Sequence, residues 1–173
     1  VVVFAVACMG LNVLVGQTGL VSFGHGAFFG LGAYAAAIGQ RTFFPGTLLP
    51  PTLFALAVVA GASVLLGLLI LRRRGVYFSL LTLALSALSF TVAFRWTALT
   101  GGESGYGGVE RTRLPGLDLD SAWTWYGLVA VTAFAVAVGL ARLRRSPVGT
   151  VLEAIRENEQ RARFLGYPTN RYK

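Results

Sequence analysis

This sequence has very few of the residues that build catalytic or metal centres. It contains one cysteine and one histidine among 173 residues. A single cysteine, Cys8, cannot form a disulfide within the chain, and its apolar surroundings are typical of a small packing residue. A single histidine excludes a histidine-rich metal site. No glycine-rich phosphate loop precedes a lysine, and no set of nucleophile, base and carboxylate comes together. We therefore expect no enzymatic activity, no metal ion and no cofactor of its own.

Charge is also scarce. Charged residues make up 13% of the chain and hydrophobic residues 55%, with a mean hydropathy of +0.67. This composition indicates an integral membrane protein, because a soluble fold would need a large core with very little surface charge. The net charge of +8 does not indicate nucleic acid as a partner, because the arginines cluster at 72–74 and after 142 instead of covering one face.

Hydrophobic runs predict an all-α, polytopic transmembrane helical bundle. The expected spans are residues 1–15, 22–40, 52–71, 76–94 and 122–141. The sequence begins within an apolar run and stops directly after a polar loop. We therefore expect it to be a fragment of a larger membrane protein.

The distribution of charge predicts one topology. Basic clusters occur at 72–74 and within 142–173, whereas the loop 97–121 has an excess of acidic residues. The positive-inside rule then places residues 142–173 in the cytoplasm and loop 97–121 in the periplasm.

A glycine-rich stretch, residues 16–26, is too polar for a plain lipid-facing helix. A break or re-entrant turn is tolerated at membrane depth only where protein or water surrounds it, and broken helices often line transport sites. Its polar residues Gln17, Thr18, Ser22 and His25 either line a translocation path or only satisfy backbone groups that the break leaves free. Gly26 and Gly30 form a GxxxG motif, which predicts close packing between helices.

The segment 146–173 is the one long polar, charged stretch. Ser146 followed by Pro147 suits the start of a helix, although Thr150 and Glu153 also have capping-box spacing. Gly166 followed by Pro168 suits its end. Apolar residues recur on one side of this helix: Val151, Leu152, Ile155, Ala162 and Leu165. Such a helix can dock on a soluble partner, form a solvated structural loop or lie on the membrane, and its mixed charges argue against the last.

Four stretches occur in an order that carries a family resemblance: GLNVLVGQTGLVSFGHGAFFGLGAYAAA, RGVYFSLLTLA, LTGGESG and SPVGTVLEAIRENEQRARFLGYPTNRYK. Together, from about Gly10 to Lys173, they resemble the M-type permease subunits of branched-chain amino acid ABC importers. The run AIRENE followed by LGY and NRYK is the most specific part. The glycine-rich block is also similar to urea and short-chain amide importers, which remain the alternative. Glu103 and Tyr106 lie in a loop that does not fix the substrate.

The resemblance implies a multi-pass subunit of the bacterial inner membrane that works by alternating access. Its implied partners are a second permease subunit, two cytoplasmic ATP-binding subunits and a periplasmic substrate-binding protein, with ATP bound by the partners. A coupling helix would dock in a groove of the ATPase, with Leu152 and Ile155 buried there. By match to the family, the coupling residues are Leu152, Glu153, Ala154, Ile155, Arg156, Glu157, Asn158 and Glu159. An ion-coupled secondary transporter is less well supported, because such carriers usually have carboxylates within the membrane and these spans have none.

Overall fold

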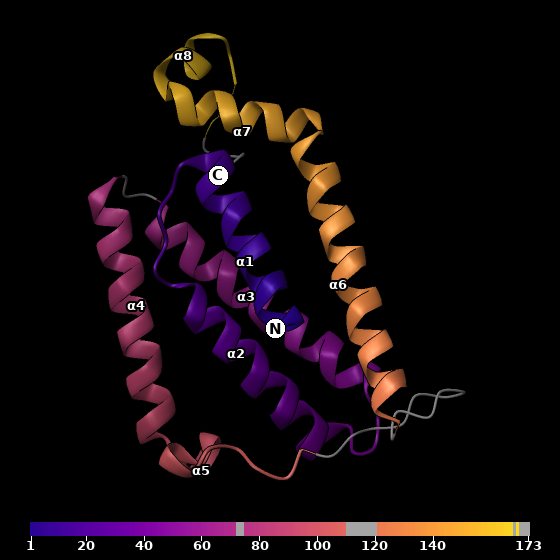
Figure 1. Ribbon diagram of the computed structural model, residues 1–173. Coiled ribbons are helices and arrows are strands. Elements are labelled where there is room, and N and C mark those ends of the chain that lie inside the picture. Colours follow the sequence, from indigo (N-terminus) through magenta and orange to yellow (C-terminus); the bar gives the residue numbers. More distant parts are fainter. Residues whose placement is uncertain (72–74, 110–120, 168, 170–173) are drawn as a thin grey trace.

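The computed structural model describes residues 1–71, 75–109, 121–167 and 169, and all regular structure in them is helical (Figure 1). The all-α prediction is confirmed. The long elements are α1 (Val2–Val13) continued by the π-helix η1 (Leu14–Thr18), α2 (His25–Ile38) continued by the π-helix η2 (Gly39–Phe43), α3 (Leu49–Ile70), α4 (Val76–Arg95) and α6 (Ala122–Arg144). The shorter elements are α5 (Thr97–Thr100), the 3-10 turn η3 (Gly102–Ser104), α7 (Pro147–Glu157) and α8 (Glu159–Phe164).

Three helices, α3, α4 and α6, are long and apolar enough to cross a membrane, with mean hydropathies of 2.7, 1.8 and 1.8. Between 0% and 11% of their most apolar windows is buried within the chain. Large apolar side chains such as Leu65, Leu88 and Phe134 therefore point outward. Such a surface is unfavourable in water, so lipid or other subunits must cover it. The chain is a membrane helix bundle.

The first two helical segments run in opposite directions along the bundle (Figure 1). The stretch from α1 to η1 ends at Gly19, whose φ of 70° is left-handed and suits glycine at a helix C-terminus. The chain then runs back beside α4, and α2 begins partway along the bundle (Figure 1). We call the connection from Gly19 to Gly24 the break. It follows the prediction of an interrupted helix in the glycine-rich stretch.

Helices α2 and α3 pack closely through small residues. A Cβ added to Gly39 would lie 3.0 Å from Phe54 Cδ1 and 3.5 Å from Pro51 Cα, and one on Gly32 would lie 3.4 Å from Val59. Ala35, between them on the same helical face, is buried. The small face therefore brings the two backbones together.

Gly26 and Gly30 do not contribute to this contact. No atom of the described residues lies within 4 Å of a Cβ added to either one. At about 100° per residue, they fall on nearly the opposite side of α2 from Gly32 and Gly39. Among the residues that the structure describes, Gly26 and Gly30 therefore meet no neighbouring helix, and their packing role stays a prediction.

A sharp elbow joins α6 to α7. The Ser146 hydroxyl accepts a hydrogen bond from the Gly149 N–H at 3.4 Å and donates one to the Leu143 carbonyl at 2.6 Å. Gly149 packs so closely that an added Cβ would lie 2.3 Å from the Arg144 carbonyl oxygen. The elbow lays α7 across the end of the bundle, with α8 beyond it (Figure 1).

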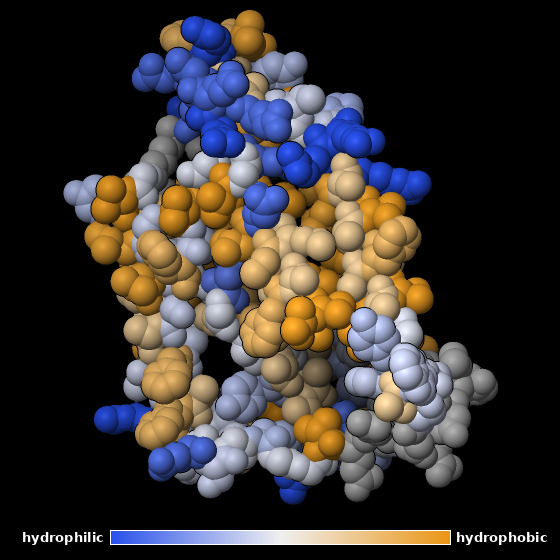
Figure 2. Space-filling model, viewed as in Figure 1, coloured by the Kyte–Doolittle hydropathy of each residue, from blue (hydrophilic) through white to orange (hydrophobic). Residues whose placement is uncertain are grey.

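Polar and apolar surfaces are segregated along the molecule. Figure 2 shows hydrophilic residues gathered at the end that carries α7 and α8, above a wide hydrophobic belt over the long helices. Arg142, Arg144 and Arg145 lie at this polar end, in and after the last turn of α6. The other basic cluster used for the topology prediction, residues 72–74, lies outside the described residues. So do residues 110–120 of the acidic loop, which carry three of its four acidic side chains.

Candidate functional site

The polar segment after α6 forms two helices where sequence analysis predicted one. Ser146 caps α7 and Pro147 is its first residue, as predicted. Asn158 then interrupts the helix with extended backbone angles, φ −156° and ψ 98°. Its side-chain Oδ1 accepts a hydrogen bond from the Arg161 N–H at 2.9 Å, so it caps α8. The single continuous helix was therefore a wrong prediction.

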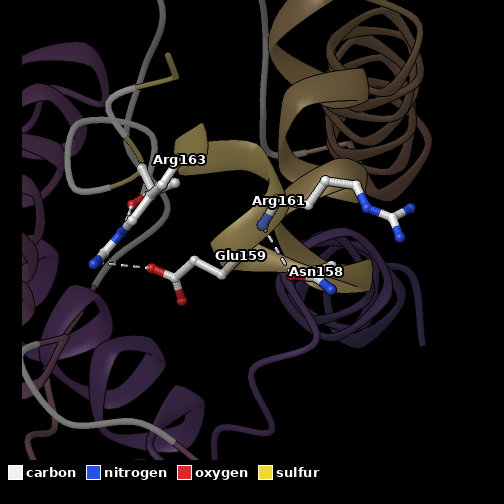
Figure 3. A network of polar contacts seen from close by, with 5 residues as sticks. Asn158, Glu159, Arg161 and Arg163 are labelled. Carbon is white, nitrogen blue, oxygen red and sulfur yellow. Dashed lines mark hydrogen bonds and ion pairs between the residues drawn. The ribbon is translucent and has the colours of Figure 1, made fainter. Parts of the chain in front are cut away.

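Short-range polar contacts stabilise α8 (Figure 3). Arg163 donates from Nη2 to Glu159 Oε1 at 3.2 Å, one helical turn earlier, and from Nε to the buried Thr169 hydroxyl at 3.0 Å. The helix ends at Gly166, which has a φ of 87°. The Gly166 N–H bonds to the Arg163 carbonyl and the Tyr167 N–H to the Ala162 carbonyl, which is the Schellman pattern. Gly166 thus ends the helix as predicted, and Pro168 lies outside the described residues.

The apolar face of α7 is buried against its own chain. Val151, Leu152 and Ile155 are 9%, 7% and 4% exposed, and α7 packs against η1. Val151 and Ile155 form a small core cluster with Ala162 of α8. The expectation that Leu152 and Ile155 are free for a partner's groove is therefore corrected, because η1, at the end of the first span, already packs against α7. Leu165, predicted to share this face, is 71% exposed.

The residues matched to the coupling motif consequently divide into two groups. Leu152 and Ile155 point inward, and Glu159 is partly buried. The remaining ones are exposed: Glu153, Ala154, Arg156, Glu157 and Asn158.

Two further apolar side chains, Phe164 and Leu165, are exposed at the end of α8. They are 90% and 71% exposed, and Tyr167 beside them is 44% exposed. Because α8 lies on the side of α7 away from the long helices (Figure 1), these side chains are beyond the hydrophobic belt. We call Phe164, Leu165 and Tyr167 the α8 tip. Sequence periodicity assigned Leu165 to the inner face because it assumed that one helix ran through Asn158.

The break is attached to α4 by two hydroxyl side chains. The Phe23 N–H donates to Thr82 Oγ1 at 3.1 Å, and Ser79 Oγ donates to the Val21 carbonyl at 2.7 Å. A Cβ on Gly24 would lie 3.2 Å from the Thr82 carbonyl oxygen, so this glycine allows the close approach. Sequence analysis missed these partners. The available signal was a serine and a threonine one turn apart in an apolar helix.

Two of the four polar residues that were assigned either to a path or to the backbone are hydrogen-bonded to local backbone groups. The Thr18 hydroxyl donates to the Leu14 carbonyl at 2.6 Å, and Ser22 Oγ accepts from the Gly24 N–H at 3.2 Å. These contacts favour the backbone-satisfying interpretation for Thr18 and Ser22, and none of them tests transport.

The other two, Gln17 and His25, remain candidates for a path. Gln17 is 2% exposed, and neither polar atom of its amide has a hydrogen-bond partner among the described residues. His25 begins α2, and its buried Nδ1 has no partner among them either. Buried polar groups are usually hydrogen-bonded, so both side chains stay predicted members of a path.

Arg156 connects α7 to the end of the first span. Its Nη1 donates a hydrogen bond to the Gly16 carbonyl, 140 positions away in the sequence. A cleft of about 550 Å³ lies beside this contact and is lined by Thr18, Gly19, Ile155 and Arg156, among others. Among the described residues, no group of three or more His, Cys, Asp or Glu side chains is placed to hold a metal ion.

Membrane-length helices and a capped helix across the polar end define a polytopic helical membrane protein. A non-helical connection packed among its helices is a feature often found in transporters. The family model for the permease component of branched-chain amino acid transport systems matches residues 1–173. The chain therefore belongs to this family.

Two curated relatives agree with this assignment. Each is a high-affinity branched-chain amino acid transport system permease protein LivM, one from Escherichia coli (strain K12) and one from Salmonella typhimurium (strain LT2), and each is 31% identical over 99% of this chain. The chain spans 45% of the length of each relative. No solved structure matches the chain.

Proposed function

We propose that this chain is part of the membrane-spanning permease subunit of an ATP-binding-cassette importer that carries branched-chain amino acids across the bacterial inner membrane. The match of the whole chain to the branched-chain amino acid permease family carries the proposal. The subunit pairs with a second permease, two cytoplasmic ATP-binding subunits and a periplasmic substrate-binding protein. It binds no ATP itself and works by alternating access that the ATPase subunits drive.

The end of the molecule that carries α7 and α8 faces the cytoplasm in this proposal. Arg142, Arg144 and Arg145 support this orientation, because arginines next to a span favour the cytoplasmic side. The two helices then project toward soluble subunits instead of lipid (Figure 2).

The proposed ATPase contact is the outer surface of this pair of helices. Its polar part is the exposed side of α7 with Glu153, Ala154 and Glu157, and its apolar part is the α8 tip. A phenylalanine that is 90% exposed is unfavourable in water and is the kind of side chain that anchors an interface. A soluble subunit is the occupant proposed here, because the tip lies beyond the hydrophobic belt.

Uptake by the reconstituted complex tests the transport function. The full-length permease, its sister subunit, the ATPases and the binding protein are placed in proteoliposomes, and labelled leucine, isoleucine, valine and urea are offered with ATP inside. ATP-dependent uptake of the branched-chain amino acids supports the proposal. Uptake of urea alone supports the short-chain amide alternative. Uptake driven by an ion gradient without ATP contradicts an ATP-driven importer.

Recovery of ATPase on the purified permease tests the docking surface. Phe164→Asp places a charge on the α8 tip without entering the core. It is expected to lower ATPase recovery at least about tenfold, because truncating a central interface anchor costs about 2 kcal/mol or more. Thr42→Asp adds the same charge in η2, at the opposite end of the molecule (Figure 1), and is expected to leave recovery unchanged. Equal recovery in both variants would exclude the tip as the contact.

A further inference from the structure

A backbone carbonyl at the end of the first span accepts a hydrogen bond from a side chain outside its own helix. The last carbonyls of a helix lack partners within it, and the negative end of the helix dipole lies there. Gly16 is in the last turn of the helix that ends at Thr18, and its carbonyl accepts a hydrogen bond from Arg156 Nη1. The guanidinium therefore satisfies a backbone acceptor and places a positive charge where the dipole favours one.

The stem of the same arginine packs on the first residue of the break. A Cβ added to Gly19 would lie 2.9 Å from Arg156 Cγ and 3.5 Å from its Cδ. Arg156 thus contacts the last helical turn through its guanidinium, at Gly16, and the first residue of the break through its aliphatic carbons, at Gly19. Ile155, the neighbouring residue, is buried and also lines the cleft beside them.

The break is held at its other end by α4. Phe23 and Val21 are hydrogen-bonded to Thr82 and Ser79, both in the first turns of α4. The break therefore lies between two attachments, α7 at Gly16 and Gly19 and α4 at Val21 and Phe23. A displacement of α7 is passed to a short connection whose far end is fixed, and the open cleft beside it leaves room for that connection to move.

We propose that Arg156 is the positioning residue that passes displacements of α7 to the end of the first span and to the break. This inference rests on the proposed function, since the ATPase subunits supply the displacement. It differs from docking because Arg156 acts between two parts of this chain and contacts Gly16 and Gly19, not the partner. Loss of the side chain uncouples ATP hydrolysis from movement of the break while the ATPase stays bound.

The experiment compares Arg156→Ala with Arg156→Lys and with Arg161→Ala in the full complex. Arg161 is an exposed arginine of α8, so the Arg161→Ala substitution removes the same charge from the same end of the molecule. Three quantities are measured: ATPase recovered per permease, ATP hydrolysed, and substrate taken up per ATP. Arg156→Ala is expected to keep recovery and hydrolysis and to lower uptake per ATP about tenfold, the effect of one charge-assisted hydrogen bond. Arg156→Lys restores part of the uptake because it can still donate to the carbonyl, and Arg161→Ala changes none of the three.

A second measurement has a wild-type arm that needs no variant. In the wild-type complex, hydrogen exchange of residues 14–24 is expected to change between ATP-bound and nucleotide-free states. In Arg156→Ala that change disappears, whereas the exchange of α7 still responds to nucleotide. A wild-type complex with no nucleotide-dependent change in residues 14–24 overturns the inference.

The outcomes separate this inference from the proposed function. Unchanged uptake per ATP in Arg156→Ala, or loss of ATPase recovery in that variant, overturns the positioning role and leaves the importer intact. A wild-type complex that shows neither ATPase recovery nor ATP-driven uptake contradicts the proposed function itself.

Discussion

Replacing Ile155 with alanine tests whether α7 is fastened to its own chain. Ile155 is 4% exposed and packs with Val151 and Ala162 where α7 meets η1. Truncating a buried isoleucine to alanine typically costs about 2–5 kcal/mol, and the cost is lower where neighbours can close the cavity. Because Ile155 also lines the open cleft, we expect the lower part of this range, about 2–3 kcal/mol. The matched control is Leu165→Ala, since Leu165 is 71% exposed and is expected to change stability by less than about 0.5 kcal/mol.

Native-state hydrogen exchange of the full-length permease without ATPase is the appropriate assay. Amides of α7 exchange when the helix undocks and opens locally, so their protection reports the free energy of that opening. A loss of about 2–3 kcal/mol lowers protection roughly 30- to 140-fold, given about 1.4 kcal/mol for each factor of ten. Leu165→Ala is expected to leave the protection of α7 unchanged.

The absence of ATPase makes the result decisive. If the apolar face of α7 were free until a partner covered it, Ile155→Ala would change nothing in the isolated permease. Equal protection in wild type, Ile155→Ala and Leu165→Ala would therefore refute the docking of α7 on η1. It would return Ile155 to the partner-facing role that sequence analysis gave it.

Three more substitutions test other contacts. Gly39→Leu is expected to destabilise the bundle by at least about 1–3 kcal/mol, because the leucine side chain would meet Phe54 and Pro51. Gly30→Leu is the control, since Gly30 has no such neighbour among the described residues. The thermal stability of the two variants in detergent distinguishes them. Thr82→Val leaves the Phe23 N–H without its acceptor and is expected to lower stability by about 1–3 kcal/mol. Thr91→Val, at an exposed position of the same helix, is expected to change stability very little. Faster hydrogen exchange of residues 19–24 in Thr82→Val is the measurement. Gly149→Ala forces its Cβ against the Arg144 carbonyl and is expected to open the elbow, and increased proteolysis between α6 and α7 in membranes reports this.

Local signals predicted the helices and their ends. Apolar runs longer than a bilayer crossing marked α3, α4 and α6. Ser146 with Pro147 marked the start of α7, and Gly166 marked the end of α8, because capping depends on residue types within a few positions. Such signals need no knowledge of the rest of the chain.

Long-range contacts were not predictable in the same way. A GxxxG motif indicates that a helix has a small face, but another small face, Gly32 to Gly39, meets α3. The hydroxyls of Ser79 and Thr82 satisfy backbone groups of the break across almost 60 positions. Their spacing of one turn marks a polar spot on an apolar helix, but it does not say which segment that spot contacts. Asn158 shows that one capping residue inside an apolar pattern can change which side of a helix the later residues occupy.

The amphipathic pattern of α7 indicated that one face is buried, but it did not indicate against what. In this chain the inner face lies on η1, and the contact is intramolecular, so α7 stays attached whether or not a soluble subunit is bound. A helix held only by its partner would be free to leave the bundle when the partner moves. A helix held by its own chain on one face must carry the first span with it when the other face is pushed. The burial of Ile155 and the Arg156 contact to Gly16 therefore give the inner face of α7 a role of its own, distinct from the docking proposed for the outer surface and the α8 tip.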